Sequence, residues 1–152
     1  IDGIGKQFEY QRHPAKWEQV LKNLEVWQTY ESNKLDLSIC HTVNIFNAFY
    51  LPEFIDWTDN FGMKVYLNTL HEPKHYNIST LPSFLKEVVK DRLLDYNYKG
   101  FNQVIQFMEN SDSSNKIGEF KRHIYRMDLV RVESFDKTFP ELSELMNIIK
   151  IR

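Results

Sequence analysis

The sequence contains very little of what a disulfide scaffold or a membrane protein requires. Cys40 is the only cysteine among the 152 residues, so an intrachain disulfide is impossible and the interior has to be stabilised by packing. The longest unbroken apolar run covers residues 48–51, whereas a bilayer-spanning helix needs about 20 residues. Aromatic side chains make up 14% of the chain, which disfavours disorder. These absences leave one soluble globular domain as the expected class.

An excess of charge of one sign is also lacking. The formal net charge is −2 and the isoelectric point is about 6.2, so the chain has no long-range field that would attract nucleic acid or an anionic membrane. A single cysteine is typical of reducing compartments, which predicts a cytoplasmic location. The chain opens at Ile1 without a methionine, and we expect that further sequence precedes it.

Helical and strand periodicities alternate along the first half of the chain. The apolar spacing predicts a helix over about 14–30 that starts at Pro14, a strand over 35–46, a helix over 52–60 ended by Gly62, and a strand over 63–70. Strands that alternate with helices are typical of βαβ units, whose strands run parallel. We therefore predict an α/β fold with a parallel sheet.

The first of these strands has two chemically different faces. Odd-numbered positions such as Leu37, Ile39 and Val43 are apolar, while even-numbered positions such as Cys40 and Thr42 are small or polar. We expect the odd face to pack against covering helices, and the even face to suit a barrel interior near a bound ligand.

The second half of the chain is predicted to be mainly helical. The helices expected from their apolar stripes cover 82–95, 99–109 and 117–130. Thr138 and Glu141 match a capping box that announces a last helix, whose apolar stripe would include Ile149. We expect residues 1–80 to form the sheet-bearing part, with residues 81–152 as a helical extension packed on it.

Polar side chains gather where the strands are expected to end. We also expect an earlier strand to end at Ile1, so that Asp2 and Gly3 form the turn after it. The candidates are Asp2 and Gly3, Asn44 and Asn47, and Asn68 and His71. Ligands bind at the carboxyl ends of parallel strands, so these residues are candidate ligand contacts. An equally open alternative is that the asparagines only cap the turns that follow the strands.

Residues 71–75 read His-Glu-Pro-Lys-His and match the HExxH pattern of zinc proteases. In that pattern both histidines lie on one face of a helix and the glutamate acts as a base. Pro73 can occupy only the first turn of a helix, which would leave His71 outside the helix and separate it from His75. A zinc hydrolase is therefore the third of the functions considered.

Other reactive residue types have plainer interpretations. His41 lies among apolar neighbours and is expected to be a hydrogen-bonded core histidine, while Cys40, in mid-strand, is expected to be buried and inert. A basic cluster at residues 116–126 has the composition of a phosphate-binding surface, but Glu119 and Asp128 interrupt it. We expect this cluster to be an ordinary solvated helix face.

Several short motifs follow one another in a fixed order. They are Ile1-Asp2-Gly3, Tyr10-Gln11-Arg12, Trp17-Glu18-Gln19-Val20 with Asn23-Leu24, Thr42-Val43-Asn44-Ile45-Phe46-Asn47, and the segment 63–73. In this order they resemble the fourth, fifth and sixth strand regions of radical S-adenosylmethionine enzymes of the SPASM/twitch group. The resemblance covers about residues 1–90.

The resemblance implies a partial (β/α) barrel with parallel strands, followed by a mainly helical C-terminal region. In that family S-adenosylmethionine lies across the strand ends, and a 4Fe–4S cluster cleaves it to a 5′-deoxyadenosyl radical that abstracts hydrogen from the substrate. By position, Arg12 would pair with the methionyl carboxylate of the cofactor. Asn44 and Asn47 would bond the ribose or the adenine edge. Asn68 and His71 would face the adenosyl group or the substrate.

The chain departs from the family at the metal cluster. The family holds its cluster with three cysteines spaced CxxxCxxC, and this chain has one cysteine, on a strand. Thiolate ligation, auxiliary SPASM clusters included, cannot be assembled from it. The chain is therefore expected to be the C-terminal part of such an enzyme, lacking the N-terminal half of the barrel and catalytically inactive alone.

A non-catalytic module that binds a protein or RNA is the second interpretation. A truncated barrel leaves an unpaired strand edge, and such edges recruit other chains. The helical second half would then offer an apolar or basic groove to the partner.

Overall fold

The computed structural model describes residues 1–32 and 34–147, and its elements alternate between helix and strand before becoming entirely helical. In chain order they are α1 (Gly5–Gln11), α2 (Trp17–Gln28), β1 (Ser38–Val43), η1 (Ala48–Tyr50), α3 (Leu51–Phe61), β2 (Lys64–Thr69), η2 (Lys74–Tyr76), η3 (Ile78–Thr80), α4 (Ser83–Tyr96), α5 (Phe101–Glu109), η4 (Ser114–Lys116), α6 (Ile117–Arg131), α7 (Phe135–Thr138) and α8 (Pro140–Leu145), where η marks a 3-10 helix. Helices make up 62% of the residues that the structure describes.

The sheet consists of β1 and β2, which run parallel and are joined by α3. Their register pairs Ser38 with Lys64 at one end and Val43 with Thr69 at the other. Gly62 ends α3 as predicted, in a left-handed conformation with φ 77°, which glycine adopts without a steric cost. The predicted α/β class with parallel strands is confirmed. Two strands are too few to define the partial barrel, which stays a prediction.

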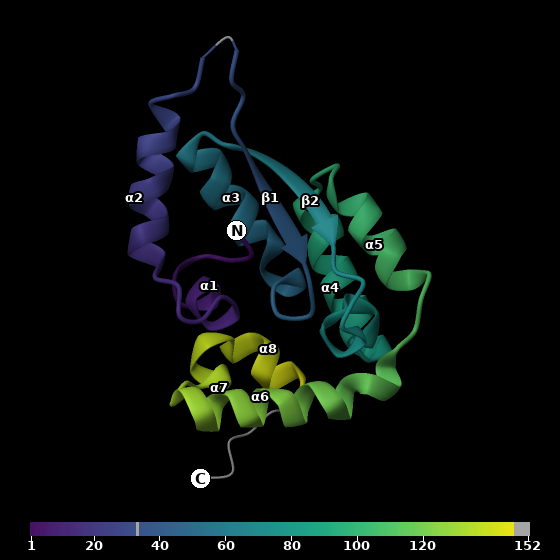
Figure 1. Cartoon of the computed structure of the whole chain (residues 1–152). Coiled ribbons are helices and arrows are strands. Elements are labelled where there is room, and N and C mark those ends of the chain that lie inside the picture. Colours follow the sequence, from purple (N-terminus) through teal and green to yellow (C-terminus); the bar gives the residue numbers. More distant parts are fainter. Residues whose placement is uncertain (33, 148–152) are drawn as a thin grey trace.

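The two faces of the sheet differ as the sequence predicts. The odd-numbered side chains Ile39, His41, Val43 and Leu67 are buried, and α3 and α4 lie behind the strands on this side (Figure 1). The even face carries exposed side chains at Ser38, Cys40, Lys64, Tyr66 and Asn68. The expected burial of Cys40 is therefore wrong, because the helices that cover the sheet lie on the opposite face.

An aromatic cluster centred on Phe46 joins the two halves of the chain. The Phe46 ring lies 5.2 Å from that of Tyr76 and 5.1 Å from that of Phe120, measured between centroids. It also contacts the rings of Tyr10, Phe135 and Phe139. Residues from both 1–80 and 81–152 thus share one core; in Figure 1, α6, α7 and α8 lie together below α1.

Polar contacts reinforce this junction between α1 and α6. The Tyr10 hydroxyl donates to Asp128 Oδ1 at 2.8 Å, and burial is the main reason why the pKa of Tyr10 is raised. Asp128 also accepts the backbone N–H of Phe135 at 2.9 Å. Arg131 Nη1 donates to the Tyr10 carbonyl at 3.1 Å. The helical second half is therefore tied directly to the first helix.

Several element ends differ from the predicted ones near the N-terminus. Helix α1 is not predicted by the sequence pattern, because it opens with Gly5 and its seven residues are too few to show a period. Helix α2 begins at Trp17 after an extended Lys16, so Pro14 is not its first residue. The first strand is shorter than predicted and starts at Ser38.

The predicted capping box at the last helix is wrong. Phe139 occupies the N-cap of α8, while the Thr138 hydroxyl donates to the Ser134 carbonyl at 2.8 Å. Glu141 instead accepts the Tyr50 hydroxyl at 2.9 Å. The Glu141 side chain thus bonds to Tyr50, far away in the sequence, and not to the N-terminus of its own helix. Ile149 lies outside the described residues.

Replacing Phe46 with alanine is expected to lower the free energy of unfolding by about 3–5 kcal/mol, because the side chain fills the centre of the aromatic cluster. Urea unfolding followed by circular dichroism measures this loss. Phe84→Ala is the matched control: its ring is 55% exposed, so a change within about 0.5 kcal/mol is expected. Equal losses in the two variants would show that the cluster is not the centre of stability.

Candidate functional site

A buried carboxylate organises the carboxyl end of β1. Asp2 is 2% exposed; its Oδ1 accepts the backbone N–H of Thr42 at 2.9 Å, and its Oδ2 accepts Nε–H of Arg12 at 2.6 Å. Arg12 Nη2 forms an ion pair with the same oxygen. A carboxylate is stable in the interior only when it is paired and hydrogen-bonded, so these contacts fix residues 1–3 and the end of α1 against β1.

Two amides extend the network to the turn after β1. Asn47 Nδ2 donates to the Thr42 carbonyl at 2.9 Å and to the Asp2 carbonyl at 3.1 Å, and its Oδ1 accepts the Asn44 N–H at 2.8 Å. Asn44 Oδ1 accepts the Phe46 N–H at 2.9 Å. These bonds are what the turn-capping alternative requires. The cofactor contacts assigned to Asn44 and Asn47 stay predictions.

Gln11 also belongs to this network. Its Nε2 donates to the Asp2 carbonyl at 2.8 Å, and its Oε1 accepts Nδ2–H of Asn44 at 3.1 Å. Gly3 permits this approach, because a Cβ at that position would lie 3.2 Å from Gln11 Nε2. Gln11 was not among the candidates, since its role depends on α1, which the sequence pattern did not predict.

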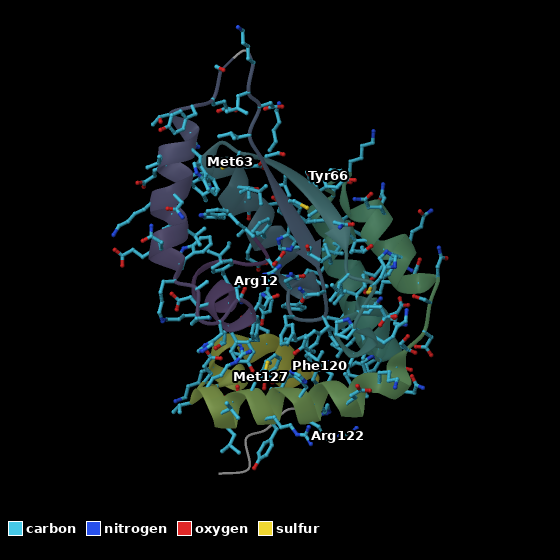
Figure 2. The ribbon with its side chains drawn as sticks, viewed as in Figure 1. Arg12, Met63, Tyr66, Phe120, Arg122 and Met127 are labelled. Atoms are coloured by element: carbon cyan, nitrogen blue, oxygen red, sulfur yellow. The ribbon has the colours of Figure 1, made fainter. Side chains whose placement is uncertain are left out.

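Arg12 is the member of the network that faces solvent. Its side chain is 57% exposed although it is anchored to a nearly buried carboxylate, and Figure 2 shows it beside the carboxyl end of β1. A guanidinium has five N–H donors in a planar fork. Those on Nε and Nη2 face Asp2, and Nη1 has no hydrogen-bond partner among the residues that the structure describes. Arg12 is therefore available to bind a carboxylate or phosphate.

The remaining two candidates lie away from Asp2. Asn68 pairs with Thr42 in the sheet register but is exposed, and its Oδ1 accepts the N–H of Thr69 at 3.1 Å. The His71 ring is edge-on to Phe107 of α5 at 5.0 Å between centroids. The structure thus brings Asp2, Gly3, Arg12, Asn44 and Asn47 together, puts Asn68 on the neighbouring strand, and turns His71 toward α5.

The two histidines of the HExxH pattern face different elements. Pro73 is the N-cap of the short helix η2, so His71 precedes the helix as expected. His75 lies beside His123 of α6, at 5.3 Å between ring centroids. Within residues 1–32 and 34–147, no three His, Cys, Asp or Glu side chains form a group able to hold a metal ion. The zinc hydrolase interpretation has no geometric support.

His41 is a buried core histidine, as predicted. Its Nδ1 lies 2.9 Å from the Ile1 carbonyl, to which it donates as the Nδ1–H tautomer, and its ring lies 4.0 Å from that of Phe54. Its Nε2 has no hydrogen-bond partner among the described residues. Burial lowers the pKa of His41 to about 4, so the ring is neutral at pH 7.

A separate shallow cleft lies between α1 and α7. Its lining consists of Lys6, Glu9, Tyr10, Lys16, Glu133, Ser134, Lys137 and Thr138. Lys6 is paired with Glu9 at 2.8 Å, and the cleft mixes charges of both signs. It therefore favours no particular ligand.

Comparisons with models of protein families, with curated protein sequences and with solved structures found no match to this chain. Among the described helices, none has both the length and the apolar character needed to cross a bilayer.

Protonation of His41 is expected to make folding pH-dependent. Between pH 6.5, the ordinary pKa, and about 4, the folded pKa, the unfolded chain holds a proton at residue 41 that the folded chain excludes. The free energy of unfolding therefore falls as the pH drops through this window, by about 3 kcal/mol in total. Urea unfolding at pH 7, 5.5 and 4.5 measures the loss.

His41→Asn is the matched variant, because its amide keeps a donor near the Ile1 carbonyl and does not titrate. We expect its stability to fall less over the same range, since only the carboxyl groups common to both proteins then contribute. Parallel pH profiles of wild type and variant would contradict the assignment to His41.

Proposed function

We propose that this chain is the C-terminal part of a radical S-adenosylmethionine-type barrel and binds the cofactor at the carboxyl end of β1 through Arg12. The observation that carries the proposal is that the Arg12 guanidinium is bonded to Asp2 on one side and exposed to solvent on the other. Asp2 holds Arg12 in place from the buried side, which leaves a preorganised cation at the strand end, where parallel α/β proteins bind ligands.

The form of the sheet supports an origin in a larger barrel. Parallel sheets are normally covered on both faces, whereas here the even face at Cys40, Tyr66 and Asn68 is exposed. Residues 1 and 2 run along β1, with the Thr42 N–H bonded to Asp2 and the His41 ring bonded to Ile1. A preceding strand would continue along this edge, and the even face would then line the barrel interior.

The residues of this chain fit binding of the cofactor but do not fit binding of the metal cluster. Arg12 suits the methionyl carboxylate, because bidentate charge-assisted hydrogen bonds are strong and directional. A 4Fe–4S cluster does not fit, since Cys40 is the only thiol and such clusters require several thiolates. In the whole protein, the cofactor and a cluster held by the N-terminal half would supply a 5′-deoxyadenosyl radical for hydrogen abstraction, in the cytoplasm. This chain would contribute binding alone.

Binding of S-adenosylmethionine should depend on its carboxylate. By isothermal titration, we expect the chain to bind S-adenosylmethionine and S-adenosylhomocysteine about 10–100-fold more tightly than 5′-methylthioadenosine, which lacks the amino acid portion. Arg12→Gln should remove most of this difference while leaving the affinity for 5′-methylthioadenosine unchanged. Amide NMR shifts at Arg12, Thr42 and Asn68 would locate the ligand.

Arg126→Gln provides the control, because it removes an exposed arginine of α6 far along the chain from the proposed site. A melting temperature for each variant separates lost binding from lost folding. Failure of the wild type to bind S-adenosylmethionine at millimolar concentration, or an Arg12→Gln variant that keeps the full preference for it, would overturn the proposal.

A binding module without catalysis is the second candidate function, and a different surface favours it. The outer side of α6 exposes Tyr125, Leu129 and Val130, whereas the solvent-facing side of a helix is normally charged or polar. This surface does not involve Arg12 or the sheet.

A further inference from the structure

Helix α6 carries a second apolar stripe on the side that faces away from the protein. Its inner side packs into the core through Phe120 and Ile124, which are buried. On the outer side, Tyr125 is 68%, Leu129 69% and Val130 81% exposed. Figure 2 shows Phe120 and Met127 on the inner side of α6 and Arg122 on the outer side.

The outer residues form one continuous strip. A helix turns about 100° per residue, so positions separated by three, four and seven residues share a face. Arg122, Tyr125, Arg126 and Leu129 follow this spacing, and Val130 borders them. We call these five residues the outer stripe. Amphipathic helices dock on grooves and faces through anchors with this same spacing.

The two arginines of the outer stripe are only weakly offset by their surroundings: the pKa of Glu119, the acidic residue one turn before Arg122, is lowered chiefly by its hydrogen bond to Lys116 and least by Arg122. Neither Arg122 nor Arg126 forms an ion pair or hydrogen bond with another residue in the described ranges. Two neighbouring cations do: Lys116, the residue just before α6, pairs with Glu119, and Arg131, at the end of α6, pairs with Glu133. The stripe is thus both apolar and cationic.

Its composition differs from that of a solvated helix face. Such faces are charged or polar all along, whereas tyrosine, arginine and aliphatic side chains in one patch are typical of the energetically important centre of protein interfaces. The charges at residues 116–126 predict an ordinary solvated face, but the exposed apolar side chains of Tyr125, Leu129 and Val130 are not typical of one.

We propose that the outer stripe of α6 docks an acidic amphipathic helix of a partner protein. The apolar face of that helix would cover Tyr125, Leu129 and Val130, and its flanking carboxylates would pair with Arg122 and Arg126. Charge complementarity selects this occupant. The inference is independent of cofactor binding at Arg12.

Other occupants suit the stripe less well. A second copy packed on the same stripe would bring four arginines together, and the acidic residue nearest to them on this face, Glu119, already pairs with Lys116. RNA would need a surface of cations, but three of the five positions are uncharged. Membrane-binding surfaces typically cluster about 4–8 basic residues, whereas the stripe has two arginines.

The test is a selection from two displayed libraries of helical peptides. Both libraries share one randomised apolar face, which is flanked by glutamates in one and by lysines in the other. With the whole chain as bait, we expect enrichment from the glutamate library alone. Leu129→Ser should then weaken binding of the selected peptide at least about tenfold, measured by fluorescence anisotropy. The double variant Arg122→Glu, Arg126→Glu should reverse the preference toward the lysine library.

Leu94→Ser is the matched control, because Leu94 is 50% exposed on α4, away from the stripe, and its replacement should leave binding unchanged. The substituted side chains are exposed, so melting temperatures should be preserved.

Several outcomes would overturn the proposal. They are equal enrichment of both libraries, no enrichment of either, or a selected peptide that binds Leu129→Ser as well as wild type. Sedimentation showing self-association that Leu129→Ser abolishes would identify a second copy as the occupant. Stripe-dependent binding to phosphatidylserine-containing vesicles or to single-stranded RNA, without peptide binding, would identify a membrane or nucleic acid instead.

Discussion

The buried carboxylate of Asp2 is the interaction on which the arrangement of the first half of the chain depends. It accepts a backbone N–H of β1 and at the same time holds Arg12, at the end of α1, in an ion pair. Because an unpaired charge at this depth would be strongly unfavourable, the segment before α1, the end of α1 and the end of β1 must remain together. The same contact orients Arg12 so that part of its guanidinium reaches solvent, and it therefore determines whether this strand end can bind an anion.

A second constraint is that all the covering helices lie on one face of a very small sheet. The odd face supplies much of the core, and the even face is left to solvent. The aromatic cluster around Phe46 compensates for the limited sheet by drawing α1, α6 and α7 into one interior. The molecule thus has a continuous core although its sheet has an open face. Both proposed binding surfaces, the strand end and the outer side of α6, lie on the periphery of this core.

Sequence patterns predicted the elements whose apolar spacing is long and regular. The helices α3, α4, α5 and α6 and the parallel pair β1 and β2 were anticipated within a few residues. Patterns failed where the local signal was short or where a tertiary contact competed with it. Helix α1 is seven residues long, and Glu141 bonds Tyr50 from another part of the chain. Cys40 was assigned to the interior, although strand position alone does not say which face is covered.

At the candidate site, the sequence identified the residue types but not all of their partners. The rule that polar groups gather at the carboxyl ends of parallel strands correctly selected Asp2, Asn44 and Asn47 as neighbours. Bonding of Asn44 and Asn47 to the backbone of the following turn was one of two open alternatives from the sequence, and their particular partners, such as the Asp2 carbonyl, depend on distances that spacing does not contain. The same rule also grouped His71 with them, whereas the chain after β2 turns that ring toward Phe107.

By itself, the sequence determined the class of fold, the parallel direction of the strands, and the exclusion of a thiolate-held cluster. These follow from periodicity and from a count of cysteines, which are local or compositional properties. Tertiary structure alone decided that Arg12 is anchored by Asp2, that Nε2 of the buried His41 has no partner among the described residues, and that one side of α6 keeps its apolar residues in solvent. Each of these features depends on which elements pack against each other, and that packing is set by contacts between residues far apart in the sequence, which local patterns do not contain.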